Sequence, residues 1–202
     1  MKKITLVSCL VILVALLVSA RWGTKAVNAP PEDTLPTPDT TLAYALSLSD
    51  MVSQSDVIAI GSCTETKSVW VDKSLVTLAT VSVTESLKGS ETSSITVALP
   101  GGADYNRKFP IAMTYPGAPQ ITPGENVFLF LTSTSDVPGS YTVAGFSQGK
   151  FSIGTDEDGE QVVTRDLTKT SLKSNNGIHR GQSNSMPLSS LKAEVKGLLQ
   201  QQ

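Results

Sequence analysis

An alternation of apolar and polar residues predicts β-strands along most of the chain. Val81 and Val83 flank a single serine. Ile95, Val97 and Leu99 repeat the same pattern further along. Because side chains of a strand point alternately to its two faces, this spacing indicates one buried face. We expect strands at residues 57–71, 75–87, 95–99, 127–131, 141–153 and 161–163.

Glycines mark the places where these predicted strands bend or turn. Gly61 lies inside the first strand, where a glycine is typical of a β-bulge. Gly145 and Gly149 lie inside the fifth strand and predict bends of a coiled strand there. Asp158-Gly159 precedes the last strand and predicts a tight hairpin.

Five consecutive apolar residues occur at 127–131, shortly after Pro123-Gly124. The run is too short to span a bilayer, and the Pro-Gly pair fits a type II turn with glycine at the positive φ. A strand that is apolar on both faces is buried on both. We therefore expect 127–131 to be a central strand, covered by a barrel core on one face and by a terminal helix on the other.

A spacing of three and four residues predicts a helix at each end of the domain. The first helix would contain Leu42, Ala45, Leu46, Leu48, Met51 and Val52. Ser47 or Ser49 is a candidate N-cap within it, and Asp50 would suit a first turn. Pro187 suits the start of a closing helix. The apolar stripe of that helix is Leu188, Leu191, Val195, Leu198 and Leu199.

These elements predict a mainly β protein: a small closed antiparallel barrel of five or six strands, with a short N-terminal helix and a C-terminal helix. Even strand spacing and glycines inside strands favour a closed barrel over an open sandwich. We expect the barrel domain at 42–166, a polar and mobile loop at 167–186 and the closing helix at 187–202.

The first 41 residues have the pattern of an export signal followed by a tether. A positively charged start precedes an apolar run, and Val18-Ser19-Ala20 offers a signal-peptidase site. We expect an exported protein, extracellular or at the cell surface, with residues 1–20 cleaved after Ala20. An uncleaved anchor is the alternative, because residues 4–20 just reach the length that spans a bilayer. Residues 21–41 are rich in proline and predict an extended tether.

Composition narrows the possible partners without naming one. The 202-residue chain has a net charge of −2, which becomes −4 once the two lysines of residues 1–20 are removed (−2 − 2). No basic patch is visible, so we expect no nucleic-acid partner. After cleavage Cys63 is the one remaining cysteine. It lies in an apolar run, and we expect a buried and inert thiol.

Five short stretches carry a resemblance to a known group of proteins. They are S-D-V-I-A-I-G-S-C (55–63), V-T-E-S-L-K-G (83–89), L-P-G-G (99–102), P-G-E-N-V-F-L-F-L (123–131) and A-G-F-S-Q-G-K-F (144–151). In this order they resemble uncharacterised exported bacterial proteins with OB-type barrels, related in shape to the netrin/metalloprotease-inhibitor (NTR) fold. The resemblance covers about residues 48–154 and the closing helix. It implies a fold rather than an activity.

The position of the cysteine differs from that in the metalloprotease inhibitors of the NTR fold. Metalloprotease inhibitors of the NTR fold chelate zinc through the N-terminal cysteine of the mature chain. Cys63 is internal, so the resemblance does not imply inhibition by that route.

The long segment from 103 to 122 is the best candidate for a binding region. Loops of this length in compact domains are usually functional or poorly ordered. This one carries aromatic residues that would be costly to leave in water, so we expect it to pack across the barrel mouth or to receive a partner. The candidate binding residues are Tyr105, Arg107, Phe109 and Tyr115.

A G-x-S-x-G motif at 145–149 is the one apparent catalytic signature. Asp158, Asp166 and His179 follow Ser147 in the chain order of an α/β-hydrolase triad. That motif requires a helix after the serine, whereas residues 150–153 continue as a predicted strand. We therefore expect no catalytic residue. The acidic run 156–160 lacks the spacing of a calcium-binding loop, and we expect no metal and no cofactor.

The sequence thus favours an extracytoplasmic, non-enzymatic binding module. Its partner would be an envelope protein, a peptide or a cell-wall polymer, with membrane contact only through residues 4–20 if these stay uncleaved. A secreted serine hydrolase using Ser147 and His179 is one alternative, and a structural cell-surface protein is another.

Overall fold

The computed structural model describes residues 39–89 and 91–202, and this part of the chain is mainly β. The prediction of a β-rich domain with a short early helix and a closing helix is therefore confirmed at that level. The predictions for the signal segment 1–20 and for most of the tether 21–41 lie outside the described residues. Neither helix in the described ranges is long and apolar enough to cross a membrane.

The described elements follow the chain in this order: β1 (Thr41–Tyr44), α2 (Leu48–Gln54), β2 (Val57–Val71), β3 (Ser74–Lys88), β4 (Ser94–Pro100), β5 (Gly102–Asp104), β6 (Ile111–Met113), β7 (Asn126–Ser133), β8 (Tyr141–Val143), β9 (Lys150–Thr155), β10 (Gln161–Asp166), β11 (Thr170–Ser174), β12 (Gly177–Arg180), β13 (Ser183–Pro187) and α3 (Leu188–Leu199).

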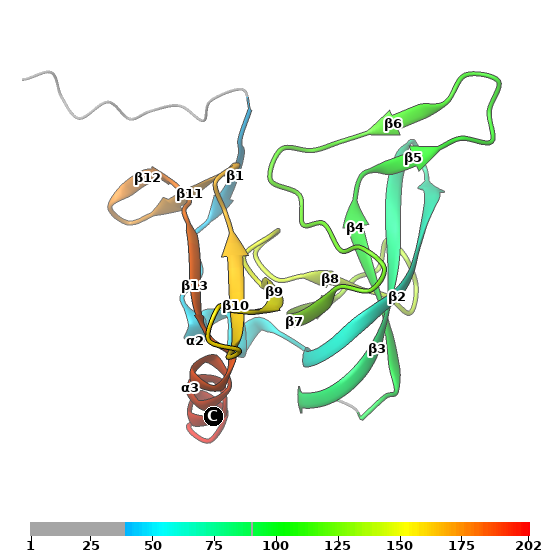
Figure 1. Ribbon diagram of the computed structural model, residues 1–202. Helices are drawn as coiled ribbons and strands as arrows, with labels where there is room; N and C mark the ends of the chain where they lie inside the picture. The colour runs from blue at the N-terminus through cyan, green and yellow to red at the C-terminus, as the bar shows by residue number, and fades with distance from the viewer. Residues whose placement is uncertain (1–38, 90) are drawn as a thin grey trace, which may run out of the picture. The chain divides into compact units, whose positions relative to one another are not determined.

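Eight of these strands form one sheet in the order β13-β10-β9-β7-β2-β3-β4-β8 (Figure 1). β7 also pairs with β8, so the pairings run from β7 through β2, β3, β4 and β8 and return to β7. The link between β4 and β8 is parallel, at Val97 and Tyr141. β1, β11 and β12 make a separate sheet in which β1 runs parallel to β11. The expectation of purely antiparallel pairing is therefore wrong in these two places.

β2 and β3 form a long antiparallel pair, and β2 contains the bulge that Gly61 predicted. The pairing register shifts between Ile60 and Gly61. A Cβ atom at Gly61 would lie 2.3 Å from the carbonyl oxygen of Ser82, closer than real contacts allow. Gly61 is therefore needed for the close approach of β3, and the prediction of a bulge at this position is confirmed.

The two faces of β7 belong to two different cores, and its five central residues are fully buried. Val127, Leu129 and Leu131 pack with residues of β2, β3 and β4 inside the ring of pairings. Phe128 and Phe130 point the other way and pack with residues of α2 and α3. The prediction of a central strand covered by a core on one face and by helices on the other is confirmed.

The first helix is shorter than predicted but begins with the expected cap. Ser47 and Asp50 form a capping box, in which each side chain accepts a hydrogen bond from the other's backbone N–H. Residues 41–44 are strand β1 rather than helix. Leu42, which the predicted helix included, is exposed there, so its helical spacing reflected no buried helical face. The parallel pairing with β11, over a hundred residues away, decides this segment.

The predicted fifth strand, 141–153, is in fact two strands joined by a turn. β8 ends at Val143 and β9 begins at Lys150. Gly145 and Phe146 both adopt positive φ, at 63° and 68°, and reverse the chain. The expectation that Gly145 and Gly149 bend one coiled strand is therefore wrong. The next prediction is confirmed, because Asp158-Gly159 lies in the tight turn between β9 and β10, with Gly159 at φ 85°.

Residues 167–186 form three strands and not a loop. β13 pairs along its length with β10, and β11 pairs with both β1 and β12. Thr170 and Ser171 are buried despite their polar side chains. The segment looked like a loop because its sheet positions hold serine, threonine and asparagine instead of an apolar alternation.

Candidate functional site

The candidate binding segment 103–122 contains a hairpin that the sequence did not predict. β5 and β6 pair with each other from Gly102 with Met113 to Asp104 with Ile111. The six residues between them, 105–110, are all exposed. The hairpin projects beyond β4 and the far ends of β2 and β3 (Figure 1).

A polar network braces the base of this hairpin against β2. The indole Nε1 of Trp70 donates to Asp104 Oδ2 at 2.8 Å, and Arg107 Nε donates to the same oxygen at 2.9 Å. Asp104 Oδ1 accepts from the backbone N–H of Asn106. The guanidinium of Arg107 also stacks over the Trp70 ring, 4.6 Å from its centroid. The bond from Trp70, then those from Asn106 and Arg107, lower the pKa of Asp104.

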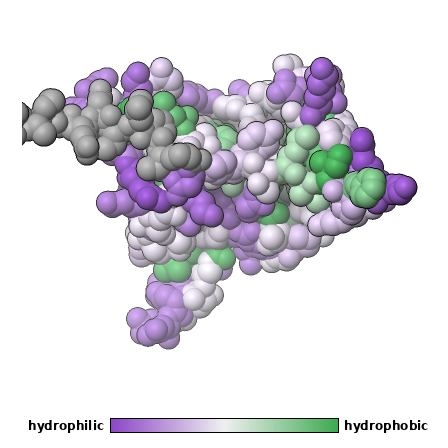
Figure 2. Space-filling model, turned by 90° about the horizontal axis from the view of Figure 1, so that it is seen from above, coloured by the Kyte–Doolittle hydropathy of each residue, from purple (hydrophilic) through white to green (hydrophobic). Residues whose placement is uncertain are grey.

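The braced tip presents two aromatic rings to solvent. Tyr105 is 77% exposed and Phe109 is 74% exposed. Figure 2 shows apolar surface among polar atoms on the side of the molecule where the hairpin projects. Aromatic rings carry large apolar areas that are costly to leave in water. Their exposure on a braced hairpin is the kind of feature that marks interaction sites.

The four predicted binding residues do not form one cluster. Tyr105, Arg107 and Phe109 belong to the hairpin tip, where Arg107 supports the base and the two rings are presented. Tyr115 lies beyond β6 and lines a cavity instead. The segment 103–122 therefore contains two distinct features, a tip and the roof of a pocket.

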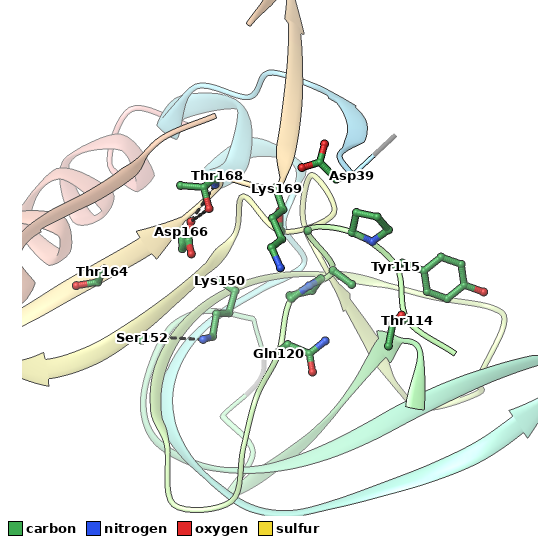
Figure 3. Close-up of a pocket in the computed structure, with 15 residues that line it drawn as sticks. Asp39, Thr114, Tyr115, Gln120, Lys150, Ser152, Thr164, Asp166, Thr168 and Lys169 are labelled. Atoms are coloured by element: carbon green, nitrogen blue, oxygen red, sulfur yellow. Dashed lines mark hydrogen bonds between the residues drawn. The ribbon is translucent and has the colours of Figure 1, made fainter. Parts of the chain in front are cut away.

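The pocket has a volume of about 710 Å³ and lies between the roof segment 114–120 and the polar face of β9 and β10 (Figure 3). Lys150 and Ser152 of β9 line it, together with Thr164 and Asp166 of β10. The intervening Phe151 turns to the opposite face, into the core beside the helices. Strand alternation thus supplies a polar floor on one face and a packed core on the other.

The roof is held near its middle and at its C-terminal end. Thr41 Oγ1 donates to the carbonyl of Pro116 at 2.6 Å. Gly117 adopts φ 68°, and a Cβ there would lie 2.5 Å from the carbonyl oxygen of Lys169, so the roof presses against the backbone that leads into β11. Just after the C-terminal end of the roof, Ile121 is buried in the core inside the ring of pairings.

Glu125, Lys150 and Ser152 form a hydrogen-bonded triangle at the edge of the pocket. Lys150 Nζ donates to Glu125 Oε1 at 2.5 Å and to Ser152 Oγ at 2.7 Å, and Ser152 Oγ donates to Glu125 Oε1 at 2.8 Å. Burial alone would raise the pKa of Glu125. The bonds from Lys150, Ser152 and the Thr122 backbone N–H outweigh burial and hold that pKa below its ordinary value.

The G-x-S-x-G residues do not adopt the geometry that the hydrolase motif requires. Ser147 is buried, and its hydroxyl is hydrogen-bonded to Thr170 Oγ1 at 3.1 Å. Strand β9, and not a helix, follows the motif. His179 is exposed on strand β12, opposite Leu172. Within residues 39–89 and 91–202, no group of three or more His, Cys, Asp or Glu side chains is placed to hold a metal ion.

Gln148, within the same motif, has a structural role that the sequence did not reveal. The side chain is 1% exposed. Its Oε1 accepts from the Leu46 backbone N–H, and its Nε2 donates to the carbonyls of Tyr44 and Gly145. It therefore ties the chain between β1 and α2 to the turn that separates β8 from β9. No local signal identifies this role, since Leu46 and Tyr44 lie about a hundred residues away.

Arg165 reaches the same turn from β10. Its Nη1 donates to the Gln148 carbonyl at 3.3 Å, and its guanidinium lies 5.0 Å from the centroid of the Phe151 ring. Burial lowers its pKa, and its Nε has no hydrogen-bond partner among the described residues. Cys63 is buried as predicted, and burial raises the pKa of its thiol.

Comparisons with known proteins add no relative from which to transfer a function. No protein-family model matches the chain, and no match is found among curated proteins or solved structures. The functional argument therefore rests on the geometry of the chain itself.

Proposed function

We propose that this protein is an exported, non-enzymatic binding module that contacts its partner through the β5–β6 tip. The partner is an envelope protein, a peptide or a cell-wall polymer. The exposure of Tyr105 and Phe109 on a hairpin braced by Trp70, Asp104 and Arg107 is the observation that carries the proposal.

The bracing is what separates this tip from an ordinary loop. Fixing a flexible segment on binding costs about 0.5–1.5 kcal/mol for each immobilised side chain, and a segment that is already ordered avoids part of that cost. Tyrosine and phenylalanine add large contact area with few rotatable bonds. An ordered hairpin that presents two aromatic rings is therefore well suited to binding a partner, which would cover the rings and remove them from water.

The fold in this proposal is a small closed barrel of the OB/NTR kind. The return of the pairings from β8 to β7 supports it, as does the apolar cluster enclosed by β2, β3, β4, β7 and β8. β9, β10 and β13 extend the sheet beyond the ring. Export rests on the pattern of residues 1–20, and mass spectrometry of the exported chain tests it through the mass expected for cleavage after Ala20.

The tip proposal is tested by capture from an envelope extract with the full-length protein. Tyr105→Ser combined with Phe109→Ser removes both rings and should abolish capture of the specific partner. Tyr44→Ser is the matched control, because Tyr44 is 73% exposed on β1, outside the hairpin. Capture of the same components at the same level by the double variant would overturn the proposal.

A further inference from the structure

The pocket beneath the roof segment 114–120 has a chemistry of its own, separate from the aromatic tip. Its walls carry hydroxyl and carboxamide side chains from different elements, among them Thr114 and Gln120 of the roof, Ser152 of β9 and Thr164 of β10. Each of these groups can both donate and accept hydrogen bonds. Ser152 and Thr164 already have hydrogen-bond partners in the protein. An apolar ligand would leave the side chains of Thr114 and Gln120 unpaired, which is unfavourable away from water. The walls therefore match a ligand that is itself rich in hydroxyl groups.

Most of the charged side chains that line the pocket already interact with another residue of the protein. Asp166 Oδ1 accepts from both the backbone N–H and the hydroxyl of Thr168. Asp39 Oδ2 lies 3.8 Å from Arg180, and Lys150 is bonded to Glu125.

Lys169 differs from these groups. Its ammonium points into the pocket (Figure 3), and no ion pair joins it to another described residue. Its charge acts on Asp166 only at longer range: the hydrogen bonds from Thr168 lower the pKa of that carboxyl most, and the charge of Lys169 lowers it further. One cation is therefore available to a ligand, and it favours a single negative charge such as a carboxylate. A phosphate is better matched by several cations or by a bidentate arginine.

The pocket is also preformed. Its roof is hydrogen-bonded to β1 through Thr41 and presses on the backbone at Lys169 through Gly117. Its floor is the paired face of β9 and β10. A volume of about 710 Å³ lies within the range of roughly 300–1,000 Å³ that small-molecule sites occupy.

We propose that this pocket binds a carboxylate-bearing sugar. Lys169 pairs with the carboxylate, and the hydroxyl and carboxamide groups of the walls contact the sugar hydroxyls. The site takes a small ligand and does not depend on what the β5–β6 tip contacts.

The test is a calorimetric titration of the full-length protein with glucuronate, with glucose and acetate as probes that each lack half of the recognised chemistry. Glucuronate should bind saturably, and the other two at least about tenfold more weakly, because a charge-assisted hydrogen bond and the sugar contacts are each of that order. Lys169→Ala should weaken glucuronate binding by roughly tenfold. Lys73→Ala, at the exposed turn between β2 and β3, is the matched control and should change nothing.

Three outcomes would overturn the proposal: equal binding of glucose and glucuronate, unchanged binding in Lys169→Ala, or no saturable binding of glucuronate. The double variant Tyr105→Ser, Phe109→Ser should keep its glucuronate binding. A failure of the tip proposal is therefore distinguishable from a failure of this one.

Discussion

Two neighbouring segments of the chain, 103–122 and strand β7, place their aromatic residues in opposite environments. Phe128 and Phe130 of β7 are fully buried, with ring centroids 5.3 Å apart. Tyr105 and Phe109 are each more than 70% exposed. β7 is held by apolar contacts on both faces, whereas the hairpin is held at its base by the side chains of Trp70, Asp104 and Arg107.

This difference shows that side-chain type alone does not say what an aromatic residue does here. In β7 the rings stabilise the fold, because each is surrounded by other apolar groups. At the hairpin tip they contribute little to the fold and remain available to a partner. Substitutions in each segment should separate the two roles.

The largest expected effect is the loss of a buried ring from β7. Phe130→Ala should lower the free energy of unfolding by about 3–5 kcal/mol, through lost burial and the cavity left between the sheet and the helices. Phe109→Ser should change it by less than about 0.5 kcal/mol, because the ring is already in water. Urea denaturation followed by circular dichroism measures both. Similar losses in the two variants would contradict the contrast between the segments.

A second substitution tests whether a buried polar side chain contributes as much to the free energy of unfolding as a buried apolar one. Gln148→Leu keeps the size of the side chain but leaves the Leu46 N–H and the Tyr44 carbonyl without their side-chain partner. The Gly145 carbonyl keeps its bond from the Ser147 backbone N–H. Each orphaned group costs about 1–3 kcal/mol, so we expect a loss of about 2–4 kcal/mol in the free energy of unfolding. Gln161→Leu, at an exposed position of β10, is the control. A neutral result for Gln148→Leu would mean that water replaces the lost bonds.

The smallest effect concerns Glu125, which lies between the two segments. The folded-state pKa of Glu125 is below its ordinary value of 4.5. The carboxylate therefore stabilises the fold above about pH 4.5, and this contribution is lost as the pH falls through the lowered folded pKa. Glu125→Gln should cost about 1.5 kcal/mol at pH 7, the lower end of the range for hydrogen bonds to charged groups.

The difference between wild type and Glu125→Gln should shrink below pH 4.5. Unfolding free energies measured from pH 7 to pH 3 test this, with Glu157→Gln in the exposed turn between β9 and β10 as the control. A difference that stays constant down to pH 3 would show that the ionised carboxylate is not what stabilises the triangle with Lys150 and Ser152.

Features that depend on neighbours in the chain could be predicted from the sequence. The limits of β2, the bulge at Gly61, the cap of α2 by Ser47 and the Asp158-Gly159 turn each follow from a few adjacent residues. The apolar run of β7 also defined its burial, since a strand apolar on both faces has to be covered on both. The closing helix followed from its apolar stripe in the same way.

Other features depend on partners far along the chain and needed the tertiary structure. β1 exists because it pairs with β11, and β13 because it pairs with β10. Their sequences are polar or ambiguous, and the backbone hydrogen bonds of a sheet do not depend on side-chain type. The reversal at 144–149 was hidden for a similar reason, because Gln148 fixes it through distant backbone groups.

The candidate sites also combine local features, which the sequence shows, with contacts between distant segments, which it does not show. The sequence alone determined that 103–122 carries unusual aromatic residues, because long segments rich in Tyr, Phe and Pro stand out from their surroundings. Only the tertiary structure separated them into an aromatic tip and the roof of a polar pocket. Trp70 braces the first from β2, and β9, β10 and Lys169 complete the second. The physical reason is that both sites are built from contacts between segments whose separation in sequence leaves no local pattern.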